Sequence, residues 1–184
     1  MAFTFKPYGG IDGLLLVEGP CYPDDRGFFF ESFRADDWAQ AGLPPLVQDN
    51  LSRSKKGVVR GLHYQIPPAA IGKLVRCSRG KVFDAVVDLR RKSPTFGKSA
   101  SIELDDAGNR MFWVPAGFAH GFCALSDSAD MTYKVTGYWT KEVDRGIRWN
   151  DPALGIKWPL SPSAAIVTAK DAALPLFADA DKPF

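Results

Sequence analysis

The sequence has very little histidine, little cysteine and no long apolar run. Among its 184 residues there are only 2 histidines and 3 cysteines. The cysteines, Cys21, Cys77 and Cys123, lie far apart and form no Cys-x-x-Cys pair. This spacing argues against both a disulfide framework and a structural zinc site. We expect all three to be reduced, buried thiols.

Runs of like charge are also missing, and the formal net charge is only +2. Proteins that bind nucleic acid or a membrane surface normally carry a basic patch, so we expect neither as a partner and favour a small metabolite. The sequence contains no stretch of about 18 consecutive apolar residues, so it predicts no transmembrane helix. Because the first residues lack the pattern of a secretory signal, we expect a cytoplasmic protein.

Helical periodicity is nearly absent from the chain. Short β-rich runs, separated by Gly, Pro, Asn and Asp, recur at the spacing of about 8–12 residues that is typical of a sandwich or barrel. The sequence predicts one clear helix at 35–41 and short helical turns within 163–173, in an all-β fold. The predicted strands are 11–18, 26–33, 46–54, 58–65, 72–79, 81–90, 97–104, 110–115, 117–126 and 129–140.

No repeat or flexible linker divides the chain, so residues 1–184 are expected to form a single domain. From residue 145 onwards proline and tryptophan become more frequent. This composition predicts an irregular C-terminal segment that wraps over a barrel, rather than another strand. Such a segment can bring a late residue back to the mouth of the barrel.

The two histidines lie in unusual blocks. His63 belongs to the stretch Arg-Gly-Leu-His-Tyr-Gln at 60–65, and His120 to Pro-Ala-Gly-Phe-Ala-His-Gly-Phe at 115–122. Histidine has an unperturbed pKa of about 6.5 and is therefore a natural proton carrier. Each histidine could be a metal ligand, an acid–base catalyst or a hydrogen-bonded core residue. For His120, a core position and a functional role have equal weight.

The pattern Pro115-x-Gly117-x-x-His120 resembles the second motif of the cupin superfamily, in which proline and glycine turn the chain and the histidine points into a barrel. Metal-binding cupins have His-x-His in their first motif, whereas 63–65 reads His-Tyr-Gln here. Transition-metal sites usually need three or four imidazole or carboxylate ligands. We therefore favour a site without a metal, and a metal-dependent cupin oxygenase or isomerase is the alternative.

Alternation along the predicted strands indicates which side chains share a cavity. If the face that carries His63 is interior, an imidazole, an ammonium and a phenol meet in the lumen, and these are groups that transfer protons. The predicted faces are Gly61, His63 and Gln65; Lys73, Val75 and Cys77; and Tyr133, Val135, Gly137 and Trp139.

This combination is suited to removing a hydrogen next to a ketone. The reaction needs a base over the hydrogen, a cation or donor at the enolate oxygen, and a second donor on the opposite face if the carbon is to be inverted. His63 is the candidate base, Lys73 the candidate enolate stabiliser and Tyr133 the candidate acid. Taken singly, the phenol would more often be a strand aromatic, and the ammonium a surface charge.

The imidazole of His63 also needs a carboxylate to orient it and to favour its cationic form. Asp171, Asp84 and Asp88 are all candidates for this part. At this point the residues alone leave the choice open.

Five segments of the chain resemble the dTDP-4-dehydrorhamnose 3,5-epimerase family, and they follow in order between about residues 11 and 175. Several of them are long enough to be specific. The segments are Gln-Asp-Asn-x-Ser at 48–52, Gly-Val-Val-Arg-Gly-Leu-His-Tyr-Gln at 57–65, Ser-Pro-Thr-Phe-Gly at 93–97, Trp-Val-Pro-x-Gly-Phe-Ala-His-Gly-Phe at 113–122 and Gly-Ile-x-Trp-Asn-Asp-Pro at 146–152.

The resemblance implies a cupin-type double-stranded β-helix (jelly-roll) barrel that works as a homodimer without a metal or other cofactor. It implies epimerisation at C3 and C5 of dTDP-4-dehydro-6-deoxy-D-glucose, with His63 as proton acceptor, Asp171 as its partner, Tyr133 as proton donor and Lys73 as enolate stabiliser. The alternatives are a C3-only epimerase or ketoisomerase of the same fold, and a sugar-nucleotide binding module without activity.

The same resemblance implies a set of substrate contacts. Arg26 and Glu31 match an Arg-Gly-x-x-x-Glu block that reaches into the site of the neighbouring subunit. Asp144 stands where the family commonly has Glu, and Trp139, at the place that stacks on thymine, replaces a more usual Tyr. The other implied contacts are Gln48, Asp49, Asn50, Arg60, His120 and Lys170.

Overall fold

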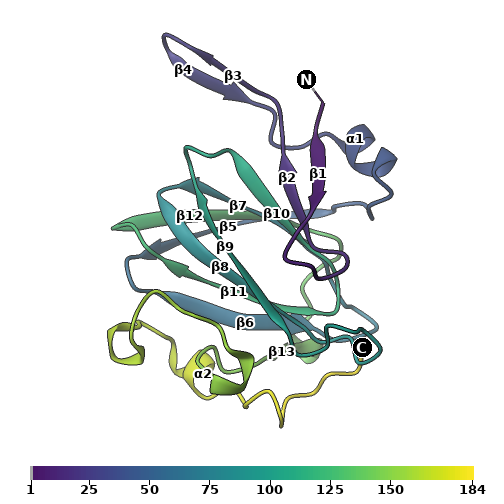
Figure 1. The fold of residues 1–184 in the computed structure, drawn as a ribbon, viewed down its shortest axis with the longest axis vertical. Coiled ribbons are helices and arrows are strands. Elements are labelled where there is room, and N and C mark those ends of the chain that lie inside the picture. The colour runs from purple at the N-terminus through teal and green to yellow at the C-terminus, as the bar shows by residue number, and fades with distance from the viewer. Residues whose placement is uncertain (1) are drawn as a thin grey trace.

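Two antiparallel sheets face each other and form the body of the protein, in a computed structural model that describes residues 2–184 (Figure 1). In the first sheet, β7 lies between β10 and β12, which come much later in the chain. The strands of this sheet, in its spatial order, are β1 (Thr4–Pro7), β2 (Leu15–Glu18), β10 (Arg110–Val114), β7 (Lys73–Arg79), β12 (Ser128–Val135) and β5 (Gln48–Lys55).

The second sheet has five strands, and here β11 lies between β6 and β8. Strands that are distant in sequence thus alternate with one another, as in a jelly roll, which confirms the predicted all-β class and cupin-type barrel. In spatial order its strands are β13 (Asp144–Gly146), β6 (Val59–Gln65), β11 (Phe118–Ala124), β8 (Lys81–Asp88) and β9 (Ser99–Asp105).

A two-stranded hairpin, β3 (Cys21–Asp24) and β4 (Gly27–Phe30), projects from one end of the body (Figure 1). Its Phe28 and Phe29 are 54% and 64% exposed. The hairpin is followed by α1 (Ala35–Gln40), which lies close to the predicted helix 35–41. Trp38 of this helix packs edge-on against Trp113, with 5.0 Å between the ring centroids. The hairpin therefore presents aromatic side chains beyond the body of its own chain.

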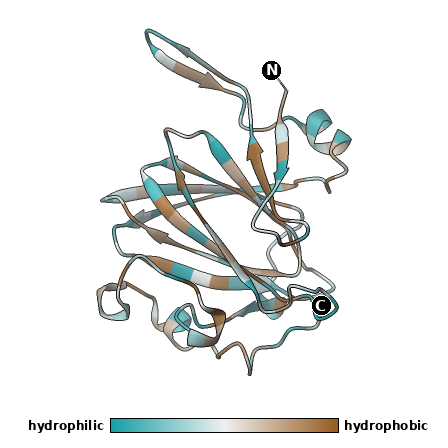
Figure 2. Ribbon diagram, in the orientation of Figure 1, coloured by the Kyte–Doolittle hydropathy of each residue, from teal (hydrophilic) through white to brown (hydrophobic). Residues whose placement is uncertain are grey.

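The main core lies between the two sheets and includes Val75, Val86, Phe112 and Phe118. Burying a side chain of this size contributes roughly 1.5–3 kcal/mol to the free energy of unfolding. The sheet residues alternate between apolar and polar, which is visible along β6 in Figure 2. Along β7 the interior face runs from Lys73 to Val75 and Cys77, so the ammonium group stands at the edge of the apolar core.

The C-terminal segment covers the outer face of β6, as predicted. Leu62 and Tyr64 of β6 pack there against Ile147, Leu154 and Phe184, and the Tyr64 hydroxyl donates to the backbone oxygen of residue 181 at 2.5 Å. The short helices of this part of the chain are η1 (Lys141–Val143), η2 (Pro152–Leu154), η3 (Pro162–Ala164) and α2 (Ala169–Ala172).

Several predicted boundaries are wrong. Strands β1, β3 and β13 are not among the predicted strands, because each has only three or four residues and is held by pairing with another strand rather than by its own pattern. The predicted strand 11–18 begins only at Leu15. The predicted strand 129–140 ends at Val135, where the Thr136 hydroxyl accepts a hydrogen bond from the N–H of Gly72 at 2.9 Å.

Two of the three predicted buried thiols are buried, Cys77 and Cys123, whereas Cys21 is only partly buried; all three are free of disulfides. No helix between residues 2 and 184 is long and apolar enough to cross a membrane.

Candidate active site

Two adjoining pockets, of about 290 and 270 Å³, share the lining residues His63, Lys73 and Tyr133. They draw on β6 and β11 of one sheet, on β7 and β12 of the other, and on α2. The larger of the two is lined by Arg60, His63, Lys73, His120, Gly121, Phe122, Tyr133, Thr168 and Asp171.

His63 and Asp171 form a hydrogen-bonded pair at this pocket. Nε2 of His63 lies 2.8 Å from Oδ1 of Asp171, and the backbone N–H of Gly61 donates to Oδ2 at 3.3 Å. Burial by itself raises the pKa of Asp171, but the hydrogen bonds and charge from His63 and Gly61 outweigh it and hold the pKa of Asp171 below its usual value. The carboxylate is therefore ionised at neutral pH and orients the imidazole.

The position of Asp171 depends on α2. The side chain of Thr168 caps this helix, because its hydroxyl accepts a hydrogen bond from the backbone N–H of Asp171 at 3.1 Å. Asp171 is 4% exposed. The C-terminal segment thus delivers a buried carboxylate to the edge of β6, as the wrapped tail predicts.

Lys73 lies at the first position of β7 and donates from Nζ to the backbone oxygen of His63 at 3.2 Å. Burial lowers the pKa of Lys73 to about 8, although the charges of Asp84 and Asp144 act in the opposite direction. The ammonium form still predominates at pH 7. A cation is therefore available beside the imidazole.

His120 lies directly across from His63, since the two Cα atoms pair between β11 and β6. Its Nε2 is 2.8 Å from Oδ2 of Asp84. His120 is 7% exposed and Asp84 is fully buried. The structure thereby separates the three candidate carboxylates: Asp171 contacts His63, Asp84 contacts His120, and Asp88 contacts neither.

Tyr133 lines both pockets from β12, which belongs to the sheet opposite β6. In register it pairs with Asn50 of β5, so the two side chains share a face. Gln48 follows on the same face by alternation and donates from Nε2 to Oδ1 of Asn50 at 2.8 Å. The phenol of Tyr133 and the imidazole of His63 therefore reach the cavity from opposite sheets, as an inversion requires.

Arg60 reaches the same pocket because of a bulge. His63 pairs with His120, but Arg60 pairs with Phe122, so three steps along β6 match two steps along β11. The predicted strict alternation is wrong at this point, because the extra residue brings Arg60 to the face of His63. Gly121 permits the close approach of the paired strands β6 and β11, because a Cβ at this position would lie 2.5 Å from the backbone oxygen of Arg60.

The smaller pocket extends the site towards Trp139, Asp144 and Lys170. Nζ of Lys170 donates to Oδ2 of Asp144 at 2.9 Å. Trp139 is 55% exposed and lies in a loop, so the prediction that it shares a strand face with Tyr133 is wrong. The loop is anchored by Gln65, whose Oε1 accepts the backbone N–H of residue 140 at 2.5 Å.

Five predicted contacts do not line the pockets that contain His63. Two of them are Gln48 and Asn50, which share the face of Tyr133 on the neighbouring strand β5. Asp49 points outward from β5 and pairs with Lys134 at 2.7 Å, with 69% of its side chain exposed. Arg26 stands at the tip of the β3–β4 hairpin, where it pairs with Asp24 at 2.5 Å. Glu31 follows directly after the same hairpin.

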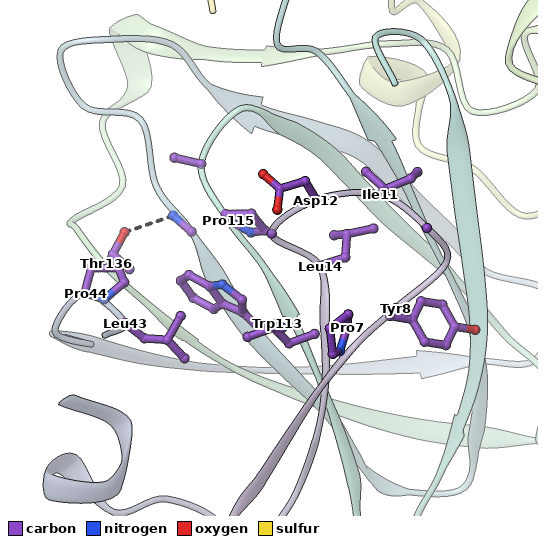
Figure 3. A pocket seen from close by; sticks show the side chains of 15 residues that line it. Pro7, Tyr8, Ile11, Asp12, Leu14, Leu43, Pro44, Trp113, Pro115 and Thr136 are labelled. Carbon is purple, nitrogen blue, oxygen red and sulfur yellow. Dashed lines mark hydrogen bonds between the residues drawn. The ribbon is translucent and has the colours of Figure 1, made fainter. Parts of the chain in front are cut away.

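A larger cavity, of about 800 Å³, has a different character (Figure 3). It lies beside Trp113 and Pro115, and its lining is mainly apolar. Among the described residues, that lining includes neither a histidine nor a lysine. The chemistry of the side chains therefore assigns the site to the smaller, polar pockets.

Sequence reasoning missed the parts played by Asp84, Gln65 and Thr168. The sequence offers Asp84 only as a candidate partner for His63. Its contact with His120 depends on the pairing of β8 with β11, in which Asp84 lies opposite Phe122, two residues along from His120. Gln65 already lay on the predicted face of His63, and this was its only signal. Within residues 2–184, no group of three or more His, Cys, Asp or Glu side chains is arranged to hold a metal ion.

Comparison with known proteins gives consistent matches over almost the whole chain. The sequence model of the family described as dTDP-4-dehydrorhamnose 3,5-epimerase matches residues 9–179. A dTDP-4-dehydrorhamnose 3,5-epimerase from Pseudomonas aeruginosa is 51% identical, over 93% of this chain and 94% of its own. A dTDP-4-dehydrorhamnose 3-epimerase from Streptomyces niveus is 40% identical, over 90% of this chain and 85% of its own.

A solved structure agrees with these sequence matches. The crystal structure of dTDP-6-deoxy-D-glucose-3,5-epimerase from Legionella pneumophila, in complex with dTDP-4-keto-L-rhamnose, is 45% identical to this chain. It superposes with a TM-score of 0.92 over 97% of this chain and 95% of its own. Both the sequence and the fold are therefore shared along nearly the full length.

Proposed function

This chain belongs to the dTDP-4-dehydrorhamnose 3,5-epimerase family, and from that membership we propose that it converts dTDP-4-dehydro-6-deoxy-D-glucose into dTDP-4-dehydro-L-rhamnose, on the route to dTDP-L-rhamnose. The enzyme is an isomerase that inverts C3 and C5, the two neighbours of the C4 ketone. The observation that supports this most is the pair His63–Asp171, at 2.8 Å, opposite Tyr133.

The proposed mechanism uses one base and one acid twice. His63 removes the proton from C3, and the negative charge moves to the C4 oxygen, where the ammonium group of Lys73 stabilises it. Tyr133 then returns a proton to the other face of the ring, which inverts the carbon. Before the second inversion, His63 releases its proton to solvent and Tyr133 regains one from solvent, so that the base and the acid are restored. The same steps then follow at C5, because this carbon is also activated by the C4 ketone. Asp171 keeps the imidazole in the orientation that both abstractions need.

The remaining side chains are proposed to hold the nucleotide and the sugar. Arg60 and Lys170 offer charge-assisted donors to the diphosphate. Trp139 offers an exposed ring on which the thymine can stack. The sugar is proposed to contact His120, Gln48, Asn50 and Asp144. Asp49, on the outward face of β5, has no contact assigned in the pocket of its own chain.

We further propose a homodimer in which the β3–β4 hairpin completes the site of the partner. The hairpin projects from the body and exposes Phe28 and Phe29, which supports a covered position in an assembly. Arg26 and Glu31 would then act in trans. Symmetric dimers of this kind place the same hairpin at each of two equivalent sites.

A C3-only epimerase of the same family is the second candidate. It is supported by the 40% identity to the 3-epimerase from Streptomyces niveus. The double epimerase is favoured because the identity to the 3,5-epimerase from Pseudomonas aeruginosa is higher, at 51%.

Incubation of the protein with dTDP-4-dehydro-6-deoxy-D-glucose in deuterated water tests the proposal. We expect deuterium at both C3 and C5 of the product, located by NMR, together with inversion of both carbons. Label at C3 alone would support the C3-only enzyme, and no enzyme-dependent label would contradict an epimerase. His63→Ala is the matched control, for which neither exchange nor epimerisation should exceed the rate without enzyme.

A further inference from the structure

The second histidine–carboxylate pair is not used by the proton transfers proposed above. Asp84 lies on the interior face of β8 between Val82 and Val86, which belong to the main core. It is fully buried, and Oδ2 lies 2.8 Å from Nε2 of His120. Burying a carboxylate costs several kcal/mol unless its partners compensate, so packing alone does not account for an aspartate at this position.

The contact between Asp84 and His120 determines where the imidazole proton lies. An ionised carboxylate can only accept a hydrogen bond, so with Asp84 in that form the hydrogen of this pair is assigned to Nε2 of His120. Nδ1 is then the ring nitrogen that His120 can offer to a molecule in the pocket. His120 lines that pocket together with Lys73, on the opposite sheet.

The other oxygen of Asp84 gives a second reason to assign it a part in the site. Within residues 2–184, Oδ1 is buried and has no hydrogen-bond partner. Oδ2 contacts His120 on β11. The charge of Asp84 raises the pKa of Lys73 on β7 and of Tyr8 after β1. For Lys73, this charge opposes the burial that lowers the pKa to about 8.

We propose that Asp84 is a positioning residue for the epimerisation: it fixes the proton of His120 on Nε2, so that Nδ1 faces the sugar in the pocket that His120 shares with Lys73. This inference rests on the proposed function. It divides the site into two halves, each with its own buried carboxylate. Asp171 serves the base that removes the protons. Asp84 serves His120, whose Nδ1 can accept a hydrogen bond from a sugar hydroxyl, beside the ammonium group of Lys73 that meets the charge of the enolate.

The small number of histidines makes the first test direct. Untagged protein labelled with ¹⁵N-histidine contains only His63 and His120, so its NMR spectrum reports four ring nitrogens. We expect His120 to be protonated on Nε2 in the free protein. Asp84→Asn should move the signals of His120 and leave those of His63 in place, and Asp171→Asn should do the reverse. This test needs no substrate, so its outcome is independent of whether the proposed reaction is correct.

The second test compares the kinetics of Asp84→Asn with those of Asp130→Asn. Asparagine keeps the shape and can still accept from His120, but it has no charge. We expect kcat to fall by about tenfold or more, with KM little changed. The alkaline limb of the pH profile should move to lower pH, because the pKa of Lys73 loses the charge that raises it.

Asp130 is the matched control, since it is a buried strand aspartate that pairs with Arg53 at 2.7 Å, away from His63 and His120. Asp130→Asn should leave the alkaline limb in place. The inference is overturned if wild-type His120 carries its proton on Nδ1 alone. The inference is also overturned if a folded Asp84→Asn protein keeps both the alkaline limb of the wild-type pH profile and the NMR signals of wild-type His120. The wild-type spectrum decides the point even if Asp84→Asn does not fold.

Discussion

In the proposed mechanism, Tyr133 is the side chain that distinguishes inversion from simple exchange. Tyr133→Phe removes the phenolic proton but keeps the ring that packs beside the core. We expect epimerisation to fall by about 10²–10⁴-fold, the usual contribution of a general acid. Wash-out of the C3 hydrogen should fall much less, because His63 can return a proton to the face from which it came. NMR in deuterated water measures both rates in one sample, and an equal loss of the two would contradict the assignment of Tyr133 as the acid.

The pKa of Lys73 sets the pH above which we expect activity to decline. This pKa is lowered to about 8 by burial, so the ammonium form predominates below that pH and is lost as the pH rises through it. We therefore expect kcat/KM to decline above about pH 8. Lys73→Arg carries a charge that persists to much higher pH, so it should be slower at neutral pH but lack this decline. A limb that is unchanged in Lys73→Arg would assign it to another group.

Part of the site could be predicted from residue chemistry alone. An imidazole, an ammonium and a phenol on alternating strand positions already indicate proton transfer beside a carbonyl. The carboxylate could not be chosen in this way, because Asp171 and His63 are 108 positions apart and meet only when the tail folds back. Arg60 could not be placed either, since its face depends on a bulge between two strands.

At the scale of elements, the close pairing of β6 with β11 at their bulge depends on Gly121. A Cβ at this position would lie 2.5 Å from the backbone oxygen of Arg60 and 3.0 Å from Cδ2 of Leu62. Because backbone atoms cannot move aside cheaply, we expect Gly121→Ala to lower the free energy of unfolding by about 1–3 kcal/mol. It should also lower kcat, since it pushes apart the strands that carry the two histidines. Denaturant unfolding and steady-state kinetics measure the two effects.

Gly10→Ala is the control for this prediction. Gly10 has a φ of +66° and open space around it, so alanine there meets only the conformational cost of the left-handed region, about 1 kcal/mol. Its kcat should be unchanged. If Gly121→Ala proved as stable and as active as the wild type, the close pairing of β6 with β11 would not require glycine.

The strands that were predicted well are those whose pattern is local. Residues 58–65, 72–79 and 81–90 intersperse apolar side chains with polar ones and show no helical period, and the structure has strands of seven or eight residues at nearly the same places. In contrast, β13 has three residues and owes its existence to the free edge of β6. Short edge strands of this kind are set by their partner, which the sequence of the strand itself does not reveal.

At the scale of the whole molecule, the proposed dimer predicts complementation between two inactive variants. Arg26→Ala alters only the hairpin, and His63→Ala alters only the base. If the hairpin acts in trans, a mixed dimer has one intact site, formed by the wild-type His63 of one chain and the wild-type Arg26 of the other. Random mixing should therefore restore about a quarter of the wild-type activity from two inactive preparations.

The experiment is performed by unfolding and refolding the two variants together, with each variant refolded alone as the control. If the hairpin serves the site of its own chain, no mixed dimer contains an intact site, and activity should stay at the level of the separate variants. That result would remove Arg26 from the partner's site.

The wrapped tail has a consequence for synthesis of the protein. The strands that carry His63, Lys73, His120 and Tyr133 leave the ribosome before α2, which carries Asp171. A nascent chain can thus pair its sheets while its base still lacks the orienting carboxylate. The proposed mechanism therefore predicts that catalytic competence is acquired only after α2 has left the ribosome. A truncated product that stops before α2 lacks the pair His63–Asp171, whatever the state of its sheets.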